Sequence, residues 1–186
     1  MLFMNTIPHP EGQIDCTVHG AILQICINRP AKRNGFTPKM FRELGEAYTR
    51  LDEDPALRVG VLCAAGDHFT AGLDLPTIAP LMKRGEKSVP LGLVDPLNLG
   101  MEGYRRRVKP MVVAVQGITY TLGIELMLAA DIVVQPMTAA SRSWRCSAAS
   151  WPRAVPRCAW PNGRARAMRF CTCSRQMCST APKPCA

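Results

Sequence analysis

The last 50 residues of this sequence lack acidic side chains altogether. Residues 137–186 contain no Asp or Glu, whereas residues 1–136 contain 14 basic and 14 acidic residues, so the whole net charge of +9 falls in this segment. All three tryptophans and six of the nine cysteines lie there too. Two compositions therefore join near Pro136. We treat residues 1–136 as one unit and residues 137–186 as an atypical basic tail.

Long apolar runs are also missing. No stretch approaches the roughly 18 uncharged residues that span a bilayer. The first 12 residues, MLFMNTIPHPEG, lack the basic and apolar regions of a secretory signal. A hydrophobic content of 47% argues against disorder throughout the chain. We therefore expect a cytoplasmic globular protein without a membrane partner.

The basic tail allows four interpretations. It could bind nucleic acid, but its arginines are scattered without helical or strand periodicity. It could bind a metal, but Cys171 and Cys173 are one residue apart and no pair has the C-x2-C spacing of a zinc site. An odd total of nine cysteines disfavours a disulfide framework. We favour the fourth interpretation: the tail is irregular, is not part of the native fold and binds neither nucleic acid nor metal.

Apolar periodicity in the front unit predicts alternating strands and helices. Residues 14–18 and 21–27 alternate like a hairpin around His19-Gly20. Thr37 resembles a helix N-cap followed by Pro38, and apolar residues recur at helical spacing as far as Asp52. Further strands are predicted at 59–64, 111–115 and 132–134, and further helices at 97–107 and 123–130. This order predicts an α/β or mixed α+β core.

Three ordered segments carry a family resemblance. They are INRPAKRNGF at 27–36, GDHFTAGLDL at 66–75 and KPMVVAVQGITYTLGIELMLAADIVV at 109–134. Together they resemble the crotonase superfamily, the enoyl-CoA hydratase/isomerase family, over about residues 14–135. The resemblance implies a crotonase-like ββα spiral core that is C-terminally incomplete. Family members usually form homotrimers or hexamers through C-terminal helices, which we do not expect this chain to form.

The resemblance implies an oxyanion hole that stabilises the enolate of a coenzyme A thioester. The Leu73 N–H would be the first donor, within Ala71-Gly72-Leu73-Asp74, where Gly72 permits a tight turn. The resemblance also implies that Ala71, Gly72, Asp74 and Gly123 are substrate-binding residues. The simpler alternative is a glycine turn in which Asp74 caps a helix.

The second donor implied by the resemblance is the Leu122 N–H, beside Gly123 at a helix N-terminus. Thr121 and Leu122 stand where the family usually has glycines. The alternative is a helix N-terminus that is only packed in the core.

Glu125 is the only acid between Met111 and Ala130, a stretch where burying a charge is costly. The resemblance implies that it is one of two catalytic glutamates that handle water and the α-proton. We expect apolar surroundings to raise its pKa. The alternative is a structural carboxylate held in a salt bridge.

Lys32, Arg33 and Asn34 match the family segment that lines coenzyme A, and two cations suit its phosphates. The alternative for each is a solvated loop residue. We interpret His68 as a surface residue without a family role. No cofactor is implied, since coenzyme A is part of the substrate.

The second catalytic glutamate of hydratases has no counterpart, because the stretch near Arg145 contains no acid. Reverse translation in the other frame permits DDCRFSQLEVQRGIMATGGATLRMAERAG after Pro136, and ADVFDGAEALR near the end. Both strings look like the continuation of a crotonase. We hypothesise that the tail is read in a shifted frame, which the encoding DNA tests.

The leading functional prediction is an acyl-CoA-binding enoyl-CoA hydratase or isomerase, impaired by its missing C-terminal part. The alternative is a non-catalytic acyl-CoA-binding remnant or pseudoenzyme. A basic interaction protein acting through the tail ranks last.

Overall fold

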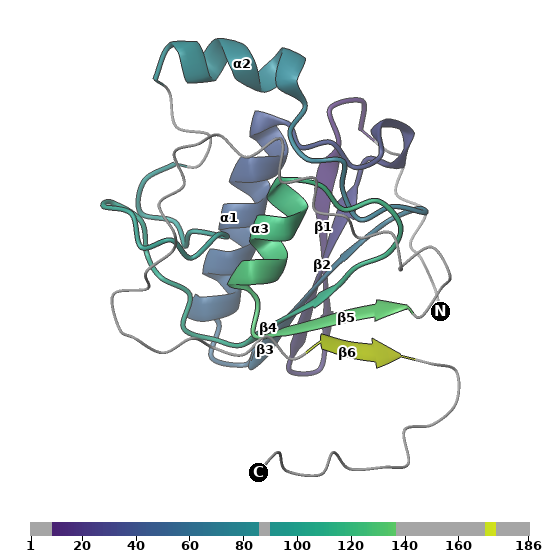
Figure 1. Cartoon of the computed structure of the whole chain (residues 1–186). Helices are drawn as coiled ribbons and strands as arrows, with labels where there is room; N and C mark the ends of the chain where they lie inside the picture. Colours follow the sequence, from purple (N-terminus) through teal and green to yellow (C-terminus); the bar gives the residue numbers. More distant parts are fainter. Residues whose placement is uncertain (1–8, 86–89, 137–169, 174–186) are drawn as a thin grey trace, which may run out of the picture.

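The computed structural model describes residues 9–85, 90–136 and 170–173. Within them, six strands form one sheet in the order β1-β2-β3-β4-β5-β6 (Figure 1). β1 is antiparallel to β2, and every later pair is parallel. The strands are β1 Gln13–His19, β2 Ile22–Asn28, β3 Val59–Ala64, β4 Met111–Ala114, β5 Ile132–Pro136 and β6 Phe170–Cys173.

Helices connect the parallel strands. The short 3-10 turn η1 (Pro30–Lys32) and helix α1 (Pro38–Glu53) link β2 to β3, and α3 (Leu122–Ala129) links β4 to β5. Helix α2 (Leu75–Lys83) follows β3 and projects from the top of the molecule in Figure 1. α1 and α3 lie next to each other on one side of the sheet (Figure 1). This arrangement confirms the predicted mixed α/β architecture.

The core lies between the sheet and α1. Alternate residues of β2 (Leu23, Ile25 and Ile27) are fully buried and face the helices, because successive strand side chains point to opposite faces. α1 begins where its sequence predicts: the Thr37 hydroxyl accepts a hydrogen bond from the Met40 N–H (3.3 Å). The predicted hairpin, the strands at 59–64, 111–115 and 132–134 and the helix at 123–130 are also present, with ends shifted by a residue or two.

The predicted helix at 97–107 is wrong. The Asp95 carboxylate accepts hydrogen bonds from the N–H groups of Leu97 (2.9 Å) and Leu99 (2.8 Å), which holds the chain in a turn. Gly100 and Gly103 follow with positive φ, so the segment curves instead of continuing as a helix. Helix α2, which contains Pro80, follows directly after Asp74, as in the alternative in which Asp74 caps a helix.

The tail contributes one described strand. We predicted an irregular tail, but Phe170–Cys173 forms β6 and pairs in parallel with β5. Cys171 and Cys173, on which the metal interpretation rests, lie in β6. The rest of residues 137–186, and with it the nucleic-acid, disulfide and shifted-frame interpretations, lies outside the described residues. Among the helices that are described, none is long and apolar enough to cross a membrane.

Candidate functional site

Two loops that are far apart in sequence lie side by side. Thr70, after β3, forms a parallel bridge with Thr119, before α3. The Tyr120 N–H donates to the Thr70 carbonyl (3.0 Å), and the Thr70 N–H donates to the Ile118 carbonyl (3.2 Å). A Cβ on Gly123 would come within 2.7 Å of the methyl groups of Thr70 and Thr119, so glycine is required for this packing. The loops that carry Leu73 and Leu122 are therefore fixed to each other.

The Leu73 N–H has no hydrogen-bond acceptor within the described residues. Leu73 forms a parallel bridge with Phe36. The bridge uses the Gly72 carbonyl, which accepts from the Phe36 N–H (2.9 Å), and the Asp74 N–H, which donates to the Phe36 carbonyl (2.9 Å). The Leu73 amide between them is left available for another acceptor.

The Leu122 N–H is likewise unpaired within the part of the chain that the structure describes. Leu122 is the first residue of α3, and the first amides of a helix have no partner inside it. The next amides are satisfied, since Gly123 donates to the Tyr120 carbonyl (2.8 Å) and Ile124 to the Thr121 carbonyl (2.9 Å). Both predicted donor amides are thus free to bind an oxygen.

Gly72 and Thr121 meet where the two loops touch. Gly72 has φ +97°, and a Cβ there would collide with the Thr121 Oγ1. The prediction that Gly72 permits a tight turn is therefore confirmed. Thr121, the N-cap of α3, has φ +39° and ψ −102°, a conformation that β-branched residues rarely adopt. Threonine at this position consequently stores backbone strain.

We expect Thr121→Gly to stabilise the fold by about 1 kcal/mol, because relief of strain exceeds the added entropy of the unfolded chain. Urea denaturation measures the difference. Thr121→Ala is the matched control, since it keeps the Cβ and with it the strained φ. Equal stability of Thr121→Gly and Thr121→Ala would show that the backbone here is relaxed.

Glu125 lies in the first turn of α3. Its carboxylate has no ion-pair or hydrogen-bond partner among the described residues, which argues against the predicted salt-bridge alternative. The side chain is exposed, but partial desolvation by nearby residues still raises the pKa of Glu125 above the ordinary 4.5. The carboxylate is available for acid–base chemistry.

Glu125→Gln should raise the midpoint of thermal unfolding at neutral pH. A raised folded-state pKa gives stability that is fully present below the unfolded pKa and is lost as the pH rises through the folded pKa. Glutamine stays neutral at every pH, so the Glu125→Gln variant should be more stable than the unmodified chain above the folded-state pKa of Glu125. At lower pH the difference in stability should vanish. Thermal melts from pH 3 to 8 measure this, and a pH-independent difference would contradict it.

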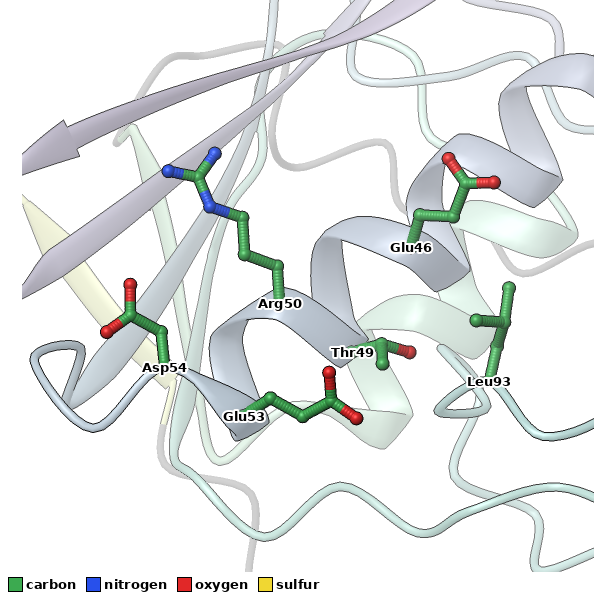
Figure 2. A pocket seen from close by; sticks show the side chains of 6 residues that line it. All are labelled: Glu46, Thr49, Arg50, Glu53, Asp54 and Leu93. Carbon is green, nitrogen blue, oxygen red and sulfur yellow. The ribbon is translucent and has the colours of Figure 1, made fainter.

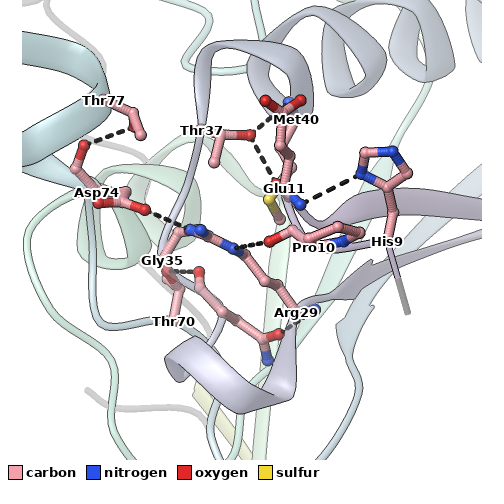
Figure 3. Close-up of polar contacts among 11 residues, drawn as sticks. His9, Pro10, Glu11, Arg29, Gly35, Thr37, Met40, Thr70, Asp74 and Thr77 are labelled. Carbon is pink, nitrogen blue, oxygen red and sulfur yellow. Dashed lines mark hydrogen bonds and ion pairs between the residues drawn. The ribbon is translucent and has the colours of Figure 1, made fainter.

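Asp74 is held by a buried ion pair (Figure 3). The Arg29 Nη1 donates to the Asp74 Oδ2 (2.6 Å) and to the Gly35 carbonyl (2.9 Å), and only 9% of the Arg29 side chain is exposed. The backbone carbonyl of Asp74 also accepts from Thr77 and Ile78 at the start of α2. Sequence analysis placed Asp74 among the substrate-binding residues, but Arg29 occupies its carboxylate. Its role is to position the Leu73 loop, and our reading of the sequence missed Arg29.

Asn34 corrects a second expectation. It is fully buried, and its amide is used within the protein: Oδ1 accepts from the Arg29 N–H (2.8 Å), while Nδ2 donates to the carbonyls of Ala65 (2.8 Å) and His68 (2.7 Å). The Thr70 hydroxyl, which sequence analysis did not single out, donates to the Asn34 carbonyl (2.6 Å). Asn34 therefore joins the loops and cannot offer its side chain to a ligand.

Lys32 and Arg33 are exposed and have no described partner, as expected of ligand-binding or solvated cations. Arg33 lines a cavity of about 310 Å³ together with Asp67 and His68. His68 is not a free surface residue as predicted, because it is half-buried and its Nδ1 accepts from the Ile118 N–H (3.3 Å).

A second cavity, of about 430 Å³, lies against the outer side of α1 (Figure 2). Its lining consists of Glu46, Thr49, Arg50, Glu53, Asp54 and Leu93, and includes no predicted site residue. The described residues also contain no group of three or more His, Cys, Asp or Glu that could hold a metal ion.

Residues 17–180 match the family model of enoyl-CoA hydratase/isomerase. The chain belongs to the enoyl-CoA hydratase/isomerase family. This match extends beyond the resemblance at residues 14–135 and enters the tail.

Individual relatives of this family align with about two thirds of the chain. Enoyl-CoA hydratase EchA19 of Mycobacterium tuberculosis is 36% identical over 117 residues, covering 62% of this chain and 43% of the relative. Carnitinyl-CoA dehydratase of Escherichia coli K12 is 36% identical over 122 residues, with 63% and 43% covered. The crystal structure of a probable enoyl-CoA hydratase/isomerase from Mycobacterium abscessus is 42% identical with a TM-score of 0.62, covering 66% of this chain and 46% of the other. The chain thus spans less than half the length of these relatives.

Proposed function

We propose that this chain binds an acyl-CoA thioester and stabilises its enolate with the N–H groups of Leu73 and Leu122. One observation carries the proposal: both amides lack an acceptor among the described residues, and the loops that carry them are joined by the Thr70–Thr119 bridge. Negative charge on the thioester oxygen in the transition state would be stabilised by both donors. The N-terminal end of α3 adds a favourable dipole.

Glu125 supplies the acid–base group of the proposed reaction. It is unpaired, its pKa is raised, and it follows the Leu122 donor by three residues on the same helix. A carboxylate so placed can accept the α-proton of a thioester or orient water for addition to an enoyl double bond. Hydration or isomerisation of an enoyl-CoA is therefore the proposed activity. Coenzyme A arrives as part of the substrate, and no step calls on a separate cofactor.

Lys32 and Arg33 are proposed to bind the phosphates of coenzyme A. Both cations are exposed, and Arg33 borders the 310 Å³ cavity next to the Asn34 loop. Unpaired cations suit a polyphosphate ligand, whereas a purely structural loop gains nothing from them.

A specific observation also favours the alternative of a non-catalytic acyl-CoA-binding remnant. The stretch near Arg145 provides no second acid. Without a second carboxylate to position water, we expect turnover far below that of a complete relative.

A short-chain enoyl-CoA assay of the full chain distinguishes the two. We expect weak turnover that falls at least tenfold in Glu125→Gln, since a positioned acid or base contributes about 10²-fold or more. Glu46→Gln, which changes an exposed glutamate on α1, should leave turnover unchanged. Acyl-CoA binding by calorimetry without turnover would support the remnant, and absence of both binding and turnover would contradict the proposal.

A further inference from the structure

Two cysteines lie side by side on the face of the sheet opposite α1. Cys26 of β2 and Cys63 of β3 are direct register partners in the parallel pair. Their neighbours Ile25, Ile27 and Leu62 point into the core, so the two thiols point to the other face, where both are partly exposed. Neighbouring strands are about 4.8 Å apart, which falls within the range of about 4.4–6.8 Å between the Cα atoms of a disulfide.

The polar surroundings make the two thiols unequal. The Gln24 Nε2 donates a hydrogen bond to the Cys63 Sγ (3.5 Å), and the Cys63 and Cys26 thiols donate to the carbonyls of Ile25 (3.6 Å) and Ile27 (3.8 Å). The neighbouring Cys26 thiol, helped by Gln24, lowers the pKa of Cys63 to about 7 against the effect of burial. The neighbouring Cys63 and burial raise the pKa of Cys26.

Charged groups on the neighbouring strand act in the same direction. Asp15 of β1 is the register partner of Cys26, and its carboxylate contributes to the raised pKa of that thiol. His19, further along β1, is hydrogen-bonded to the Gln24 side chain (3.1 Å) and not to either sulfur. Cys63 is therefore the more acidic thiol of the pair and the one that more readily forms a thiolate.

We propose that Cys63 and Cys26 form a peroxide-reactive thiol pair that closes reversibly into a disulfide. The Cys63 thiolate attacks hydrogen peroxide, the O–O bond breaks, and Cys63 becomes a sulfenic acid while the leaving hydroxide is protonated to water. The Cys26 sulfur then attacks the sulfenic sulfur, its proton leaves with the hydroxyl group, and a second water forms. Two thiols and one peroxide thus give one disulfide and two waters.

The role is separate from the thioester chemistry, because the thiols and the donor amides use different parts of the fold. Cys63 lies within β3, upstream of the loop that carries Leu73. Neither cysteine hydrogen-bonds to a residue of the proposed oxyanion loops. A reducing dithiol would reverse the disulfide by exchange.

Peptide mapping of the full chain tests the proposal. Trypsin isolates Cys63 in peptide 59–83, whereas Cys26 shares peptide 1–32 with Cys16, because trypsin cleaves Arg-Pro bonds poorly. The experiment therefore uses Cys16→Ser, in which only Cys26 can join 1–32 to 59–83. The protein is treated with one equivalent of hydrogen peroxide, alkylated and digested. We expect peptides 1–32 and 59–83 to be found mainly as one disulfide-linked species, which dithiothreitol separates.

Two measurements keep the test decisive if a variant folds poorly. In Cys16→Ser/Cys26→Ser, a reagent that reacts with sulfenic acids should label peptide 59–83, because Cys26 is no longer present to form the disulfide. In the unmodified reduced chain at pH 7, iodoacetamide should alkylate Cys63 at least about fivefold faster than Cys16, whose pKa is raised by burial. Equal alkylation rates, or peroxide products confined to other cysteines, would overturn the proposal.

Discussion

Leu122→Pro in the Thr121→Gly background is expected to lower turnover of an enoyl-CoA by about 10²- to 10³-fold, the usual cost of one oxyanion donor. Proline removes the N–H, and the first position of a helix is where proline is best tolerated. The glycine is included because proline restricts the residue before it, and Thr121 already has an unusual backbone conformation.

The matched control is Leu122→Ala in the same background. Leu122 is 2% exposed, so both variants lose buried apolar contacts, but alanine keeps the amide donor. Because turnover of this chain is expected to be low, the second readout is the carbonyl stretch of a bound acyl-CoA thioester in isotope-edited infrared difference spectra. Hydrogen bonding lowers that frequency. We expect the lowered frequency in the Leu122→Ala variant and a smaller lowering in the Leu122→Pro variant. The same frequency in both variants would remove Leu122 from the proposed site.

The sequence predicted the elements that are determined by capping residues, turns and the spacing of apolar residues. α1 combines the Thr37 cap, Pro38 and an apolar period, and all three indicate the same helix. The β1–β2 hairpin follows from alternation around a glycine turn. The helix expected at 97–107 failed because Asn98, Gly100 and Gly103 have positive φ, which a right-handed helix cannot contain.

The candidate site was predictable only in part, because its main groups belong to the backbone. An amide donor carries no side-chain signature, so only Gly72 and Gly123, which allow close packing, marked the two loops. The unpaired state of Glu125 could not be predicted either, since it depends on what every other strand and loop brings near α3. Arg29 was missed because its partner, Asp74, lies 45 residues away.

Asn34 shows why neighbouring polar residues cannot be assigned from their order. Lys32, Arg33 and Asn34 all looked suited to coenzyme A, but the left-handed conformation of Arg33 and Asn34 turns one side chain outward and the other into the protein. Only the tertiary structure distinguishes a cation open to a ligand from an amide that joins two loops.

Asn34→Ala should therefore cost about 3–5 kcal/mol of folding free energy, since it removes three buried hydrogen bonds at a residue with φ +55°. Arg33→Ala is the matched control. Arg33 has φ +48° and the same backbone penalty, but its side chain is exposed, so the cost should stay within about 1 kcal/mol.

Urea denaturation and acyl-CoA calorimetry on both variants separate the two roles. Because a typical domain is stable by only about 5–15 kcal/mol, the Asn34→Ala chain should unfold at a much lower urea concentration. Arg33→Ala should instead fold normally and bind acyl-CoA more weakly, because it loses a cation beside the 310 Å³ cavity. If Asn34→Ala kept its stability and lost only affinity, Asn34 would be a ligand-binding residue after all, and the loop that carries Leu73 would need another anchor.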